Sequence, residues 1–300
     1  MYNESNKNRY LDQAFASDDL QRAIVKNIFE TMEDFEKLYN KDLYDFNATE
    51  IENAYKTMNL NSITRLRNIN SRLLQYTQWC QKESLVKDGI NHYEEFYGDR
   101  MYNYIDRTYV ENGLISRDLI LSIASEMINP MDAFATIALF EGFGGVGRED
   151  FEYAKIDHIK DDCIELRNRT IKVSPEFIEY AKRASAQTIY FSRKSERYDT
   201  LLDENDDLIY KRPIKRRSDP TNRIVEYRLK REFSYLGYDD ISIRDIVKSG
   251  RVHYLKTESI KKGIDPKDFC SQYKQDISCQ FGLDINYIPV VYQELRLFLV

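Results

Sequence analysis

The sequence predicts a mainly α-helical protein of two domains that carries one small β-hairpin or sheet. Apolar residues recur at helical spacing through much of the 300-residue chain. One pair of adjacent β-rich runs, Cys163–Arg167 and Thr170–Val173, flanks Asn168 and Arg169 as the strands of a hairpin would. The length suits two domains of ordinary size, which we expect at residues 1–112 and 114–300, divided near Gly113.

Composition narrows the classes of function. No run approaches the roughly 18 apolar residues of a membrane span, and the first residues lack the order of a signal peptide, so we expect a cytoplasmic protein. Scattered cysteines and histidines lack zinc-ligand spacing, and no phosphate-binding loop or hydrolase motif occurs. We therefore expect no metal and no cofactor. The net charge of −6 argues mildly against nucleic acid as a partner, although local clustering of Lys and Arg decides that question.

The first domain is expected to be a series of helices. Ser17, Asp18 and Asp19 precede a helical run, and Asn47–Glu50 begins another. The best-defined helix covers residues 61–81, where apolar residues from Ile63 to Cys80 form one stripe. Residues 82–113 are expected to form a last helix and a connector.

The polar side of the 61–81 helix gives the first candidate binding residues. Four side chains fall largely outside the apolar stripe: Arg65, Arg67, Asn68 and Arg72. Such side chains contact phosphates and base edges in DNA complexes. The alternative is a solvated face on a core helix.

The second domain is expected to begin with a helix over Leu114–Ile128, followed by one over Met131–Glu141 that stops at a glycine cluster. A short helix, Glu149–Ile156, should precede the hairpin. Ser174 and Pro175 then begin a helix that should extend to Tyr190. A polar surface loop over Ser192–Asp207 and a short strand at Leu208–Tyr210 complete this part.

A concentrated basic stretch follows, against only two acids, Asp219 and Glu226. Its cations are Lys211, Arg212, Lys215, Arg216, Arg217, Arg223, Arg228, Lys230 and Arg231. We expect a surface loop that leads into a helix with Ile224, Tyr227, Leu229 and Phe233 facing inward. In an acidic chain, such a local excess of positive charge indicates phosphate contact, although a solvated charge run is the alternative.

Several segments resemble tyrosine recombinases. The order helix, tight turn, helix, K-x-D-H-I and hairpin resembles the opening of their catalytic domain, and SITRLRNINSRLLQYTQWC resembles a helix of their core-binding domain. Their turn reads roughly G-L-R-x-x-E, whereas this one reads GFGGVGRED. The position of their first catalytic arginine therefore falls on or near Gly147. In YDDISIRDIVKSGRVHYL, Arg244 stands at a catalytic histidine, Val247 at the second arginine and Lys248 at the next histidine. Tyr292 stands near the nucleophile.

More specific phrases resemble the SPbeta-type phage lytic-cycle repressors (MrpR-type): K-D-L-Y-D-F, Q-Y-x-x-W-C, N-P-x-D-x-F-x-x-x-x-L-F-E-G and I-x-x-S-G. This resemblance implies a helical core-binding-like (SAM-like) domain and a catalytic-like domain without catalysis. It implies a repressor that binds double-stranded phage operator DNA to keep a prophage silent, with a second recombinase-like phage protein as a further candidate partner. Arg244, Lys248 and Arg251 join the candidate DNA contacts.

Two other classes of function remain. An active recombinase would use Arg148 as first arginine and Tyr292 as nucleophile, but it needs further donors to the phosphate. An adaptor would bind a partner integrase or repressor through its tyrosine-rich surface. Covalent DNA linkage would identify the recombinase, and weak, salt-insensitive DNA binding would identify the adaptor.

Overall fold

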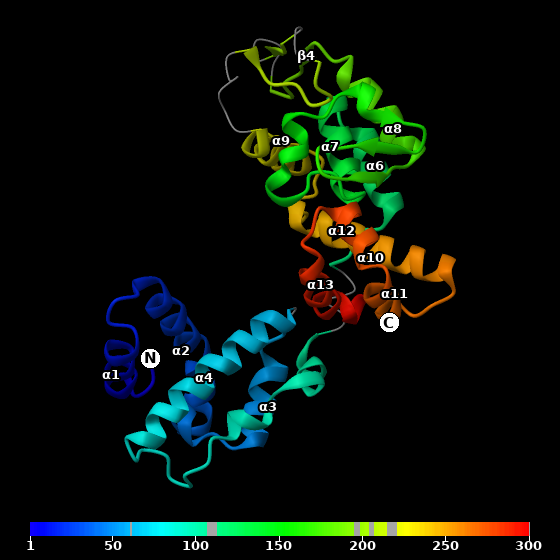
Figure 1. Cartoon of the computed structure of the whole chain (residues 1–300). Coiled ribbons are helices and arrows are strands. Elements are labelled where there is room, and N and C mark those ends of the chain that lie inside the picture. The colour runs from blue at the N-terminus through cyan, green and yellow to red at the C-terminus, as the bar shows by residue number, and fades with distance from the viewer. Residues whose placement is uncertain (61, 107–112, 195–198, 204–206, 215–220, 300) are drawn as a thin grey trace. The chain divides into compact units, whose positions relative to one another are not determined.

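A computed structural model describes residues 1–60, 62–106, 113–194, 199–203, 207–214 and 221–299. Two compact units, Met1–Glu111 and Asn112–Val300, make up the chain, and helices dominate both (Figure 1). The predicted fold class, mainly helical with two domains and small sheets, is confirmed. No described helix is long and apolar enough to cross a membrane.

The first unit contains the helices α1 (Glu4–Ala14), α2 (Asp19–Tyr39), α3 (Ala48–Thr57) and α4 (Ile63–Lys82). Side-chain caps begin three of them, and the sequence indicated the first two. Asp18 accepts a hydrogen bond from the Gln21 amide, Asn47 and Glu50 form a capping box, and Ser62 accepts from the Arg65 amide. Short 3-10 helices cover Leu43–Asp45 (η1), His92–Glu95 (η2) and Gly98–Tyr104 (η3).

The last helix expected in this unit is absent from described residues 83–106, which contain only η2 and η3. Burial of the ring of Tyr93 and the ring of Phe96 explains the difference. The Asn70 side chain on α4 donates to the Phe96 carbonyl at 2.9 Å and the Tyr93 carbonyl at 3.3 Å. Those carbonyls therefore satisfy their hydrogen bonding without a helix.

A buried charge cluster fastens α1 to α2. Lys7 and Glu36 are fully buried, and the Lys7 ammonium donates to Glu36 Oε1 at 2.5 Å, with Asp42 Oδ1 at 3.8 Å. Burial raises the pKa of Glu36 to about 7, against the attraction of Lys7. Glu36 Oε2 has no hydrogen-bond partner. Two carboxyl groups share one buried ammonium here.

The second unit is built around α7 (Pro130–Phe140), whose residues from Met131 onward are all buried. Four helices pack against it: α6 (Arg117–Glu126), α8 (Pro175–Ser185), α9 (Thr221–Tyr235) and α10 (Ile243–Lys262). Figure 1 shows α6, α8 and α9 around α7. The chain ends with α11 (Pro266–Gln272), α12 (Lys274–Phe281), η8 (Ile285–Tyr287), α13 (Ile288–Leu295) and η9 (Arg296–Phe298).

The hairpin is confirmed. β2 (Cys163–Glu165) pairs antiparallel with β3 (Thr170–Lys172), with Ile164 opposite Ile171. These two isoleucines enter the core. A third strand that the sequence analysis missed, β1 (Ile159–Lys160), pairs with β2, and a separate pair joins β4 (Ile189–Tyr190) to β5 (Thr200–Leu201).

Four local expectations were wrong. The helix expected at Glu149–Ile156 is instead two 3-10 helices, η4 (Val146–Glu152) and η5 (Ile156–His158). Helix α8 ends at Ser185, since Ile189–Tyr190 pairs as a strand. Leu208–Tyr210 forms only an isolated bridge, Leu208 to Lys155. The Tyr227 side chain points outward and is 62% exposed, because Val225 and Arg228 take the inner face of α9.

Candidate nucleic-acid interface

The polar face of α4 presents Arg65 and Asn68 to solvent, one helical turn apart. Both line a groove of about 590 Å³ with Asn27 and Thr31 of α2, over an apolar floor that includes Ile28. No described side chain forms a hydrogen bond or ion pair with the Arg65 or Asn68 side chain. The groove thus offers donors and acceptors fixed on two helices. Sequence analysis missed Asn27 and Thr31, because nothing in α2 alone shows which face meets α4.

Arg67 and Arg72, on the same helix, are half-buried and already make contacts within the unit. The Arg67 guanidinium lies 5.7 Å from the Tyr102 ring centroid. Arg72 donates to the side chains of Gln21 at 2.5 Å and Gln75 at 3.1 Å. Of the four predicted α4 residues, Arg65 and Asn68 are therefore the ones whose side chains can reach a ligand without losing these contacts.

In the second unit, α7 ends at a glycine turn that takes left-handed backbone conformations. Gly145, Gly147 and Arg148 have φ of 62°, 74° and 63°, which explains why no α-helix continues here. Gly147 is exposed, and a Cβ there would meet nothing within 4 Å. The resemblance put the first catalytic arginine on or near this glycine, which has no side chain. Its neighbour Arg148 donates through Nη1 to Glu226 Oε2 of α9 at 3.1 Å.

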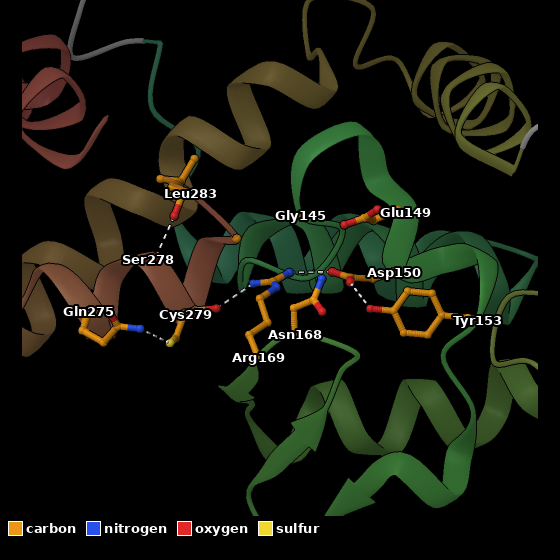
Figure 2. A pocket seen from close by; sticks show the side chains of 11 residues that line it. Gly145, Glu149, Asp150, Tyr153, Asn168, Arg169, Gln275, Ser278, Cys279 and Leu283 are labelled. Carbon is orange, nitrogen blue, oxygen red and sulfur yellow. Dashed lines mark hydrogen bonds and ion pairs between the residues drawn. The ribbon is translucent and has the colours of Figure 1, made fainter. Parts of the chain in front are cut away.

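Behind the turn lies a polar pocket of about 210 Å³, between η4, the hairpin tip and α12 (Figure 2). Its centre is the buried pair of Arg169 and Asp150, joined at 2.5 Å. Asp150 also accepts from the Gly144 amide at 2.7 Å and the Tyr153 hydroxyl at 2.8 Å. Arg169 donates further to the carbonyls of Cys279, Gln280 and Gly142. Sequence analysis missed this pair, because nothing near Arg169 along the chain indicates its partners.

Helix α10 carries the three other predicted contacts. Arg244 is exposed, whereas Lys248 pairs with Asp245 at 3.4 Å. Arg251 is half-buried, and burial lowers its pKa. Its Nε is buried without a hydrogen-bond partner. Val247, expected at the position of a second catalytic arginine, packs against the hydrophobic core.

Gly250 brings α10 against the end of α7. A Cβ on Gly250 would lie only 1.8 Å from the Phe140 carbonyl oxygen. The neighbouring Ser249 hydroxyl donates to the Asp245 carbonyl and accepts from the Ile115 amide. The two helices are thus in backbone contact, which fixes α10 relative to the glycine turn.

Part of the basic stretch faces inward, contrary to expectation. Lys211 is only 7% exposed, and its amide donates to Met131 Sδ, which draws the segment under α7. Arg228 is 4% exposed and its guanidinium lies 3.9 Å from the Tyr190 ring centroid. Arg223 is exposed on α9. Lys215, Arg216 and Arg217 lie outside the described residues.

Arg228 belongs to a buried cluster around Asp132 of α7. The Tyr190 hydroxyl donates to Asp132 Oδ2 at 2.7 Å and Tyr210 to Oδ1 at 3.4 Å. Burial raises the pKa of Asp132 to about 6, against the attraction of Arg228. The cluster fastens β4 and α9 to α7. Its cations serve the fold rather than an open surface.

Tyr292 lies half-buried on α13. Among the described residues, no group of three or more histidine, cysteine or acidic side chains is arranged to hold a metal ion.

The first unit is helical. In the second unit a glycine turn, a hairpin and a helix packed closely through Gly250 meet. This combination defines a two-domain, recombinase-like protein. Two family models match the chain: the MrpR N-terminal core-binding domain over residues 1–82 and the MrpR C-terminal catalytic domain over residues 114–294. The chain belongs to the MrpR family. It is also similar to the SPbeta prophage-derived uncharacterized protein YopR of Bacillus subtilis (strain 168), at 22% identity over 280 residues, which covers 88% of this chain and 84% of that protein.

Proposed function

We propose that the protein is a sequence-specific DNA-binding transcriptional repressor that holds the lytic genes of a prophage silent. In this proposal both recombinase-like domains contact double-stranded operator DNA, and no strand is cut. The family and the prophage relative support the phage setting. The polar α4 groove, with Arg65 and Asn68 on a rigid helix, supports readout of base edges, because rigid helices place side chains in a major groove.

One observation carries the proposed absence of chemistry. The resemblance puts the first catalytic arginine on or near Gly147, an open glycine, and the second at Val247, a valine packed against the core. Phosphoryl transfer to a tyrosine needs cationic donors where charge develops on the phosphate, and one missing donor costs a few kcal/mol of barrier. With two missing, the Tyr292 hydroxyl has no activated phosphate to attack.

Two experiments test the proposal. Nicked suicide DNA substrates should trap no covalent adduct, and Tyr292→Phe should bind and repress like the wild type. Gel shifts against the intergenic DNA of the host phage, with scrambled duplex as control, should show salt-dependent, sequence-selective binding. A stable adduct that disappears in Tyr292→Phe would identify an active recombinase instead. Equal binding to both duplexes would refute sequence-specific repression.

A further inference from the structure

We propose that the outer face of α9, together with Arg148 of the glycine turn, is a contact surface for the DNA phosphate backbone, and that Glu226 restrains it by holding Arg148. This inference rests on the proposed DNA-binding function. It adds a surface that contacts the phosphates and a carboxylate, Glu226, that competes with them for Arg148.

The surface follows from the spacing of α9. Four exposed residues, Arg223, Glu226, Tyr227 and Lys230, stand at intervals of three and four and therefore share one helical face. Their inner neighbours, Arg228 among them, are buried in the core. No described acidic side chain forms an ion pair with Arg223 or Lys230.

Arg148 extends this face from another element. η4 packs against α9, and the Arg148 guanidinium reaches Glu226 at 3.1 Å. Three cations from two elements thus share one face with a single carboxylate, in a chain whose net charge is −6. A local excess of this kind is the electrostatic footprint of a polyanion contact.

Glu226 is the one acidic side chain on this face, and its side chain is 62% exposed. A solvent-exposed ion pair is weak, so a DNA phosphate that approaches α9 can displace the carboxylate from Arg148. The backbone of Arg148 is held in the left-handed conformation, φ 63°, next to the open Gly147. The side chain therefore extends from a defined backbone position, and its guanidinium can exchange the Glu226 carboxylate for a phosphate.

Four full-length variants test the surface and the competitor: Glu226→Gln, Arg148→Gln, the double variant, and Glu179→Gln as matched control. Glu179 pairs with Arg183 on α8, an exposed arginine–glutamate pair of the same unit, and its loss changes the net charge equally. The measurement is fluorescence anisotropy of a labelled mixed-sequence duplex over about 50 to 200 mM KCl.

Glu226→Gln should bind the duplex up to about five-fold more tightly, the limit set by the strength of an exposed pair. Arg148→Gln should bind more weakly and lower the salt slope by about 0.9, one phosphate contact. In the double variant the gain from Glu226→Gln should largely vanish. Glu179→Gln should leave binding almost unchanged.

The alternative is that the Arg148–Glu226 pair only fastens the turn to α9. Glu226→Gln would then bind no more tightly than the wild type, and the slope of Arg148→Gln would be unchanged; either result refutes the inference. An equal gain in the Glu226→Gln and Glu179→Gln variants would also refute it, since net charge alone would explain the effect. Absence of any duplex binding by the wild type would instead overturn the proposed function itself, and the inference with it.

Discussion

Gly250→Ala provides a sharp test of how α7 and α10 are held together. In an ordinary helix interior this change stabilises by roughly 0.5–1 kcal/mol, because alanine loses less backbone entropy. Here the new Cβ would lie 1.8 Å from the Phe140 carbonyl oxygen and 2.6 Å from its carbonyl carbon. Both atoms belong to the backbone of α7, so no side-chain rotation relieves the overlap.

The helices must therefore separate locally by more than 1 Å to restore contact near 3 Å. Overpacking of this kind costs typically about 1–3 kcal/mol, and the absence of a flexible neighbour favours the upper end. After the gain in helix propensity, a net loss of about 2 kcal/mol in the free energy of unfolding is expected.

Urea unfolding of the full chain, followed by circular dichroism, measures this loss. Lys256→Ala, at an exposed position of the same helix, is the control and should change stability by no more than about 0.5 kcal/mol. If Gly250→Ala is as stable as the wild type, the backbones of α7 and α10 are not in close contact at this position.

Three further predictions concern charge and DNA contact. Glu36→Gln should gain stability relative to the wild type as pH rises from about 4.5 to about 7, by at most about 3 kcal/mol. The folded wild type keeps the Glu36 proton over this range while the unfolded chain loses it, so the wild type loses stability and the glutamine variant does not. A stability difference between the two proteins that is the same at low and at high pH would contradict this. Alanine at Arg216 and Arg217 should weaken binding to operator and scrambled duplex alike and lower the salt slope by roughly one unit per lost phosphate contact, whereas alanine at Arg65 should cost about 1–3 kcal/mol on operator only. If the Arg216 and Arg217 variants lose operator preference while the Arg65 variant keeps it, that segment reads the sequence and Arg65 contacts the backbone. Each domain alone, separated near Gly113, should bind far more weakly than the whole chain, since two tethered modules raise avidity; full-strength binding by one half would refute this.

Local sequence signals predicted the elements whose causes are local. Caps at Asp18, Asn47 and Ser174 begin helices where they were expected. The hairpin forms as expected, although Glu165 pairs with Thr170, so its turn lies one residue earlier than Asn168 and Arg169. The glycines after α7 end that helix as expected.

The sequence failed where distant residues decide. Tyr190 became a strand residue because Thr200 pairs with it and Asp132 accepts its hydroxyl. Arg228 left the surface for the same cluster, 96 positions from Asp132 along the chain. The sequence of a basic stretch does not show which of its side chains face solvent and which pair with a buried carboxylate. Counting its cations therefore overestimated the positive charge exposed on the surface.

The contacts of Arg169 have a consequence for local unfolding. Its guanidinium binds the carbonyls of Cys279 and Gln280, which belong to the last turn of α12, and also Asp150 beside the glycine turn. Opening that last turn of α12 requires the same side chain to release its carbonyls. Amide hydrogen exchange in α12 therefore reports on the turn that holds Gly147, even though no residue of α12 lies in it. If a ligand tightens or loosens that turn, the exchange rates of the amides near Phe281 should change with it.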